Sequence, residues 1–157
     1  MATTELAADL AAPVPTPETG RVQLALNVDD LAASVAFYTT LLGTGPAKLR
    51  PGYANFSVAS PPLKLVLLEN PGQGGSLNHL GIEVAGSEQV RGEIDRLSGA
   101  GLVTAEETAS TCCYATQDKV WVTAPTGERW EVYTVLADSP TFGDSPKAQD
   151  AAVAACC

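Results

Sequence analysis

The sequence predicts an α+β fold in which two βαβββ modules share one curved mixed sheet around a cleft. The order of predicted elements is the same in residues 21–70 and in residues 78–137, although the residue identities barely repeat. A glycine-rich stretch, residues 70–75, separates the two halves. Each half has too little apolar surface for a core of its own, so the pair is expected to pack on a common sheet.

The first half begins with an alternating segment, residues 21–28, which predicts a strand. Asp29 or Asp30 is expected to cap the helix that follows, and Gly43 to end it. The helix carries apolar residues at helical spacing, namely Leu31, Val35, Tyr38 and Leu42. Two strands follow, at residues 53–58 and 63–69.

The second half repeats this order. Residues 79–84 are predicted to be a strand, and Ser87 is expected to cap a helix that ends near Gly99 or Gly101. This helix carries Val90, Ile94 and Leu97 at helical spacing. Two strands follow, at residues 119–123 and 128–135, joined by a turn at residues 124–127.

The two ends of the chain differ from the folded part. Residues 1–20, rich in Ala, Pro, Thr and Glu, are predicted to be a disordered leader, and residues 138–157 a flexible tail. The folded domain is therefore expected at residues 21–137. The first residues lack the basic start and apolar core of a secretory signal, and no apolar run is long enough to span a membrane, so a cytoplasmic location is expected.

The charge balance excludes two classes of partner. The formal net charge is −9, and no basic stripe is present to neutralise phosphates, which argues against nucleic acid. The same acidity argues against anionic membrane surfaces.

The four cysteines occur as two adjacent pairs, Cys112-Cys113 and Cys156-Cys157. Neighbouring cysteines bridge poorly, because a disulfide needs Cα atoms farther apart than consecutive residues and facing Cβ atoms. Free thiols are therefore expected, and adjacent thiolates are suited to soft ions such as trivalent arsenic, Cd²⁺ or Cu(I). The tail pair could capture and hand over such a ligand, or could be incidental.

Three polar residues on predicted strands are candidate metal ligands. His79, the one histidine, opens the first strand of the second half, and Gln23 holds the matching place in the first half. Glu131 lies between apolar neighbours in the last strand, where a buried carboxylate needs a partner. That partner could be a divalent cation or an Arg or Lys side chain, and Glu131 could also face water. His79 could equally be an ordinary satisfied polar residue.

Four stretches of residues 21–143 resemble the vicinal oxygen chelate superfamily of glyoxalase I, bleomycin-resistance proteins and extradiol dioxygenases. Within it they are most similar to the bacterial organoarsenical C–As lyases and the actinobacterial cadmium-induced proteins. The stretches are residues 22–28, residues 78–81, residues 111–119 with the sequence TCCYATQDK, and residues 127–133 with the sequence GERWEVY.

The resemblance implies a paired βαβββ fold around a metal cleft, with Fe(II) held by Gln23, His79 and Glu131. It also implies that Cys112 and Cys113 bind the substrate. The implied reaction is O₂-dependent cleavage of the carbon–arsenic bond of trivalent methyl or aromatic arsenicals, which releases arsenite.

The pocket that holds the metal and the substrate could also be lined by Tyr114, Lys119 and Tyr133.

The paired halves could be completed within one chain or by exchange between the two chains of a homodimer.

Three other functions compete with the lyase. The first is a cadmium- or arsenic-responsive binding protein that uses the thiols without catalysis. The second is a glyoxalase-like isomerase, which normally needs four hard ligands, whereas the counterpart of Glu131 in the first half falls among residues 65–67, all apolar. The third is an antibiotic-binding protein without a metal.

Overall fold

The computed structural model of the 157-residue chain describes residue 18 and residues 20–143. Most of the predicted leader and most of the predicted tail, including Cys156 and Cys157, lie outside the described residues. The elements in chain order are β1 (Arg21–Val28), α1 (Leu31–Leu42), β2 (Lys48–Arg50), β3 (Tyr53–Val58), β4 (Leu63–Glu69), β5 (Leu77–Glu83), α2 (Ser87–Gly99), β6 (Ala105–Cys112), β7 (Ala115–Thr123) and β8 (Arg129–Asp138).

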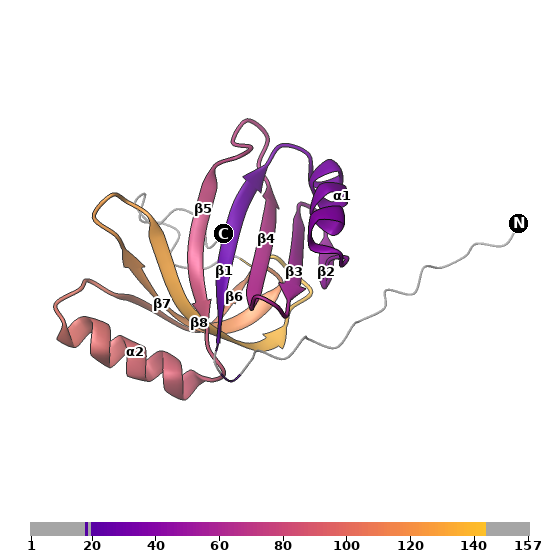
Figure 1. Ribbon diagram of the computed structural model, residues 1–157. Coiled ribbons are helices and arrows are strands. Elements are labelled where there is room, and N and C mark those ends of the chain that lie inside the picture. The colour runs from indigo at the N-terminus through magenta and orange to yellow at the C-terminus, as the bar shows by residue number, and fades with distance from the viewer. Residues whose placement is uncertain (1–17, 19, 144–157) are drawn as a thin grey trace, which may run out of the picture.

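All eight strands form one curled mixed sheet with two helices on its outer side, which confirms the predicted fold class (Figure 1). The strand order is β2-β3-β4-β1-β5-β8-β7-β6. Strands β1 and β5 run antiparallel at the centre, and each has a parallel partner from its own half, β4 for β1 and β8 for β5. The two modules are therefore related by an approximate twofold axis that passes between β1 and β5.

Strand β1 shows how the two faces of the sheet differ. Because side chains alternate along a strand, Gln23 and Ala25 face the concave side, and Leu24 and Leu26 face the helices. The outer cluster under α1 consists of Val28, Leu31, Ala54, Phe56, Leu65 and Leu67, and a second outer cluster under α2 consists of Leu97, Val120 and Val132. These two cores hold the curled sheet that positions the concave face.

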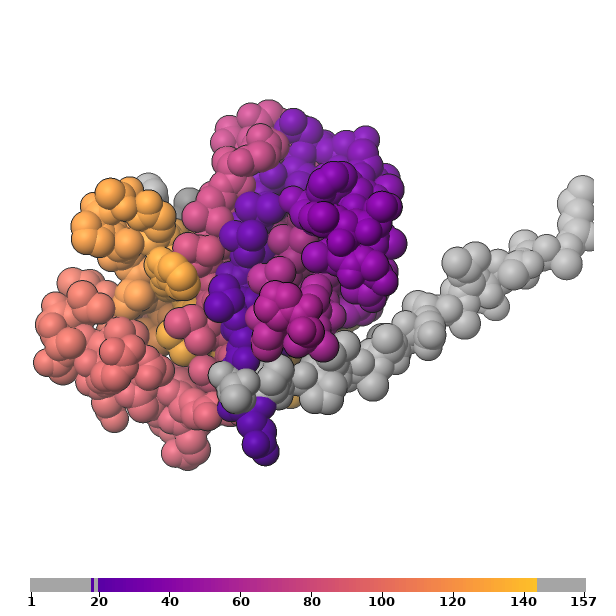
Figure 2. Space-filling view, in the orientation of Figure 1, coloured from indigo at the N-terminus to yellow at the C-terminus, as the bar shows by residue number. Residues whose placement is uncertain are grey.

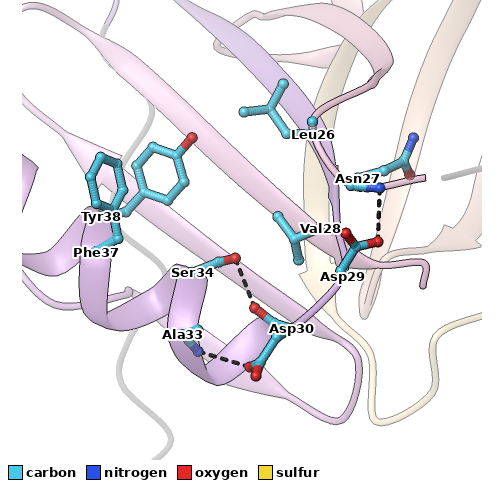
Figure 3. A pocket seen from close by; sticks show the side chains of 11 residues that line it. Leu26, Asn27, Val28, Asp29, Asp30, Ala33, Ser34, Phe37 and Tyr38 are labelled. Carbon is cyan, nitrogen blue, oxygen red and sulfur yellow. Dashed lines mark hydrogen bonds between the residues drawn. The ribbon is translucent and has the colours of Figure 1, made fainter. Parts of the chain in front are cut away.

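Helix α1 begins and ends as predicted. The Asp30 carboxylate accepts a hydrogen bond from the Ala33 amide at 2.9 Å, and Gly43 ends the helix in the left-handed region with a φ of 68°. The N-terminal part of α1 lines an outer pocket of about 410 Å³, with Asp30, Ser34 and Tyr38 in its wall (Figure 3). This pocket lies on the helix side of the sheet, away from the concave face.

Helix α2 corrects one prediction. Its N-cap is Gly86, with no side-chain cap, and Ser87 is the first helical residue. The Ser87 hydroxyl instead donates to Asp118 on β7 at 2.6 Å. The Ser87 side-chain oxygen, which local sequence rules assign to capping the helix, is thus used in a contact with a distant strand. In the space-filling view, α2 lies along the outside of the second half and α1 along the outside of the first (Figure 2).

Each βαβββ module contains one strand whose position was not assigned from the sequence, β2 in the first half and β6 in the second, and β7 starts at Ala115 instead of residue 119. Both missed strands are edges of the sheet, where little apolar alternation is needed because one side is solvated. Among the described residues, no helix has the length and apolar character that crossing a membrane requires.

Candidate metal centre and thiol pair

Gln23 and His79 occupy equivalent positions of the two central strands. In the β1–β5 pairing, Gln23 lies opposite Gly81 and His79 lies opposite Ala25, so the twofold axis exchanges Gln23 with His79. Glu131 lies beside Gly81 on the next strand, β8. The register therefore brings the three predicted ligands to one place on the concave face, where each is at most 4% exposed.

The three side chains meet in a small triangle of polar atoms. Gln23 Nε2 lies 2.7 Å from Glu131 Oε1 and 3.1 Å from His79 Nε2, and His79 Nε2 lies 3.4 Å from the same carboxylate oxygen. Ligands at right angles on a metal with bonds of about 2.1 Å are about 3.0 Å apart. The triangle thus has the size of one face of a metal's coordination shell, and the residues fit a divalent cation provided that Gln23 presents its amide oxygen.

Gly81 keeps this triangle open. A Cβ atom at this position would lie 3.2 Å from Gln23 Cβ, from Gln23 Nε2 and from Glu131 Cγ. Any other residue would therefore press on two of the three candidate ligands at once.

Among residues 18 and 20–143, no three His, Cys, Asp or Glu side chains gather closely enough to hold a metal ion. A metal centre on the concave face therefore depends on the amide of Gln23 as the third ligand.

The tautomer of His79 is set by a chain of amides. Its Nδ1 lies 2.7 Å from Asn78 Oδ1, and the Asn78 amide nitrogen in turn donates to Asn27 Oδ1 at 3.0 Å. The Asn27 amide nitrogen continues the chain to Ser76. Because Asn78 offers an oxygen, Nδ1 carries the proton, and the Nε2 lone pair points into the triangle, as metal ligation requires.

Glu131 has a second partner in addition to the triangle. Lys119 on β7 donates to Glu131 Oε2 at 2.8 Å, and both side chains are almost fully buried. Burial opposes ionisation of this carboxyl group, but the ammonium group of Lys119 outweighs that effect and holds its pKa below the usual range. Of the partners considered from the sequence, a lysine is therefore present, and it leaves Oε1 directed at the triangle.

Tyr133 supports Gln23 from the other side. Its hydroxyl donates to Gln23 Oε1 at 2.5 Å and lies 3.2 Å from Glu83 Oε2. Glu83 is itself paired with Arg21, whose Nε is 2.7 Å away, and with Lys64 at 3.8 Å. Burial, together with Glu83 and Glu131, raises the pKa of Tyr133 well above its ordinary value, so the hydroxyl keeps its proton at any working pH.

The first half has no carboxylate to match Glu131. Ala25 is the twofold counterpart of Gly81, and its neighbour on β4 is Val66. Val66 is therefore the counterpart of Glu131, and it is apolar and buried. The candidate centre would therefore offer three ligands, where a glyoxalase-like isomerase normally uses four.

Cys112 and Cys113 lie at the tip of the β6–β7 hairpin. Cys112 is the last residue of β6, and Cys113 and Tyr114 form a two-residue turn with φ values of 53° and 59°. A type I′ turn needs positive φ at both positions, which usually selects Asn and Gly. Each non-glycine residue in this region costs about 1 kcal/mol or more, so the turn holds a Cys and a Tyr against their backbone preference.

The thiols are not free in this structure, which corrects the expectation from the sequence. Both Cys112 and Cys113 are in disulfides, and the 3.4 Å between their sulfur atoms excludes a bond from one to the other. Adjacency disfavours a bridge within a pair but places no restriction on bridges to other cysteines, which is why the prediction was wrong.

The hairpin tip reaches across to the first half. Cys113 and Tyr114 pack against a cluster of Ala25, Tyr53, Val66 and Leu68. The Tyr114 carbonyl accepts bonds from Lys48 Nζ at 3.1 Å and from the Ser139 amide at 2.9 Å, which anchors the tip. Because Ala25 lies opposite His79 and belongs to the cluster that Cys113 contacts, the hairpin tip packs on the same concave face as the triangle of polar atoms.

The three candidate ligands and the cysteine pair were singled out from the sequence, but the residues that contact them were not. Lys119 and Tyr133 were expected only to line the pocket, and Asn78, Gly81 and Glu83 were not singled out as functional. The one available signal was the run of polar residues at alternate positions of strands that are otherwise apolar, as in β5 and β8.

The fold agrees with the comparison to known proteins. Residues 20–132 match the Glyoxalase/Bleomycin resistance protein/Dioxygenase superfamily. The chain belongs to this superfamily.

Two relatives are similar over most of their length. The Cadmium-induced protein CadI of Mycobacterium tuberculosis is 68% identical over 130 residues, which cover 83% of this chain and 86% of CadI. The Trivalent organoarsenical cleaving enzyme of Thermomonospora curvata is 58% identical over 138 residues, 87% of each chain.

Among solved structures, the Mn(II)-bound glyoxalase from Novosphingobium aromaticivorans has a TM-score of 0.57 at 18% identity. The match covers 83% of this chain and 44% of that one, and it shows the shared fold.

Proposed function

We propose that the protein is an Fe(II)-dependent enzyme that cleaves the carbon–arsenic bond of trivalent organoarsenicals with O₂ and releases arsenite. The observation that carries this proposal is the placement of two different sites on one concave face. A hard triangle of nitrogen and oxygen atoms lies on β1, β5 and β8, and a soft pair of sulfur atoms lies on the hairpin tip that packs beside it. The 58% identity to an enzyme named for organoarsenical cleavage supports the same function.

The metal would be held by Gln23, His79 and Glu131, with Lys119 on the outer oxygen of Glu131 to balance its charge. When bound, Fe(II) supplies coordination positions for O₂ and the electrons that activate it. Val66, the counterpart of Glu131, has no donor atom, so the first half would supply no further ligand and a bound metal would keep a position for this small molecule. The buried lining of the centre keeps bulk water from the reacting atoms.

Cys112 and Cys113, once reduced, would hold the arsenic atom. The two sulfur atoms are 3.4 Å apart. An arsenic atom bonded to both at about 2.3 Å, the length of a zinc–thiolate bond, would therefore have an S–As–S angle of about 95°. That angle is below the tetrahedral value and suits a pyramidal trivalent atom that carries a lone pair. The third substituent of arsenic, its carbon group, would then face the wall formed by Ala25 and Val66.

The direct test is turnover. We expect protein loaded anaerobically with Fe(II) to convert methylarsonous acid to arsenite when air is admitted, with arsenic speciation by chromatography and mass spectrometry as the readout. Protein without added metal should give no arsenite. If Fe(II)-loaded, reduced protein forms none, the lyase proposal is wrong.

Replacing Glu131 with glutamine separates an enzyme from a binding protein. The amide keeps the shape of Glu131 but loses its charge and one of its two acceptor oxygens, so arsenite formation should fall at least about 100-fold while arsenical binding stays unchanged. Equal loss of both would indicate damage to the fold, which circular dichroism would detect. The second candidate function, a cadmium- or arsenic-sequestering protein, is favoured by the 68% identity to a cadmium-induced protein. In such a protein, the Glu131 substitution should leave cadmium or arsenic binding unchanged.

Arsenical binding should require reduction of the protein. Because no cysteine in the described part of the chain is free, oxidised protein offers no thiolate to arsenic, whereas phosphine-reduced protein offers four, among them Cys112 and Cys113. We expect methylarsonous acid to bind the reduced chain, as detected by mass spectrometry, and not the oxidised chain. Replacing either Cys112 or Cys113 with serine should weaken binding at least about tenfold, because a single thiolate loses the chelate.

A further inference from the structure

We infer that Tyr133 and Glu83 are positioning residues that let the Gln23 amide present its nitrogen in the metal-free centre and its oxygen to a bound cation. This inference rests on the proposed metal centre and explains how an amide can serve there as the third ligand. It concerns a hydrogen-bond network whose members are all buried, so water cannot replace a missing partner.

The metal-free arrangement satisfies every polar atom of the Gln23 amide. Its NH₂ group donates to Glu131 Oε1 at 2.7 Å, and its second hydrogen is directed to His79 Nε2 at 3.1 Å. Its oxygen accepts from the Tyr133 hydroxyl at 2.5 Å. The NH₂ group thus occupies the place of a cation, and the lone pairs of His79 Nε2 and Glu131 Oε1 are directed at it.

A cation cannot be bound in this arrangement, because the nitrogen of an amide carries hydrogens and has no available lone pair. The amide must turn about its last side-chain bond, so that the oxygen enters the triangle and the NH₂ group faces Tyr133. The Tyr133 hydroxyl would then be opposite a donor, and its own hydrogen would need another acceptor.

Glu83 is that acceptor. Its Oε2 lies 3.2 Å from the Tyr133 oxygen, and the cationic groups of Arg21 and Lys64 lie 2.7 Å and 3.8 Å from the same carboxylate oxygen. When the amide turns, the Tyr133 hydroxyl rotates its hydrogen to Glu83 and accepts from the Gln23 nitrogen. Both orientations of the amide are therefore hydrogen-bonded, and one rotation of a hydroxyl group links them.

A direct test follows the Gln23 side-chain NH₂ group by ¹⁵N NMR during titration with Zn²⁺, which is diamagnetic. The Gln23→Glu variant, which lacks the NH₂ group, assigns the signal. In metal-free protein, the NH₂ hydrogens should show nuclear Overhauser contacts to the His79 ring. In the Zn²⁺ complex these contacts should be lost and contacts to the Tyr133 ring gained.

Two outcomes would overturn the inference in distinguishable ways. If the His79 ring signals do not respond to Zn²⁺, the cation does not bind the triangle, and the proposed centre fails together with the inference. If the His79 signals shift but the Gln23 contacts stay as in the metal-free protein, the centre stands and the inference fails.

A double-mutant cycle tests Glu83 without relying on NMR. With Glu83→Gln, the acceptor that Tyr133 needs once the Gln23 amide has turned becomes neutral, so Zn²⁺ affinity should fall about fivefold to tenfold in the chain with Gln23. With Gln23→His as the background, no amide has to turn, and the same Glu83→Gln change should alter Zn²⁺ affinity less than about twofold. Equal losses in both backgrounds would show that Glu83 acts only through its charge, which contradicts the inference.

Discussion

Replacing Gly81 with alanine should lower the affinity of the protein for Zn²⁺ or Fe(II) by about 100-fold without unfolding it. The added Cβ would lie 3.2 Å from atoms of both Gln23 and Glu131, so these ligands must move apart by a few tenths of an ångström. Metal sites tolerate deviations of only about 0.2 Å in ligand position. Gly81 lies in a regular strand without a positive φ, so the backbone itself accepts alanine.

The control for this change is Gly92→Ala on helix α2. A Cβ at Gly92 would meet nothing within 4 Å, and alanine in a helix interior is favoured over glycine by about 1 kcal/mol. That variant should bind metal like the parent protein and be slightly more stable. Isothermal titration or chelator competition gives the affinities, and thermal unfolding confirms the folds. Unchanged affinity in Gly81→Ala would mean that the metal does not use this triangle.

Replacing Lys119 with methionine should destabilise the metal-free protein by about 3–5 kcal/mol at pH 7, since it leaves Glu131 buried without its ammonium partner. Urea unfolding monitored by tryptophan fluorescence measures this loss. Excess Zn²⁺ should restore part of it, because a bound cation replaces the lost charge. The control is Arg91→Met, which removes an exposed ion pair with Glu88 and should cost no more than about 0.5 kcal/mol.

The pH dependence of the Lys119→Met effect has a definite sign. In the parent protein the pKa of Glu131 is held below its usual range, so its ionised form adds stability above the unfolded pKa of about 4.3 and loses it as the pH falls through the folded value. Without Lys119, burial dominates and the pKa rises, so the variant is penalised as the pH rises through that value. The stability difference between the two proteins should therefore be larger at pH 7 than at pH 4. A difference independent of pH would contradict the pairing.

Local sequence patterns predicted the elements whose signals are local. The alternation in residues 21–28, the Asp30 cap and the Gly43 end each depend on neighbours a few residues away, and each is present in the structure. Ser87 failed as a cap because its hydroxyl bonds Asp118, 31 residues away, and no local rule contains that contact. The edge strands β2 and β6 were missed because an edge needs little apolar alternation.

The sequence by itself determined the fold class, the order of the two modules and the residue types available for chemistry, since these depend on composition and periodicity along the chain. Only the tertiary structure decided how these residues act. The register of β1, β5 and β8 places Gln23, His79 and Glu131 around Gly81. Pairing across strands then gives Glu131 a lysine and gives the Gln23 amide a tyrosine. Such contacts join residues as many as 110 positions apart, and hydrogen bonding and burial at that range depend on packing that no local pattern encodes.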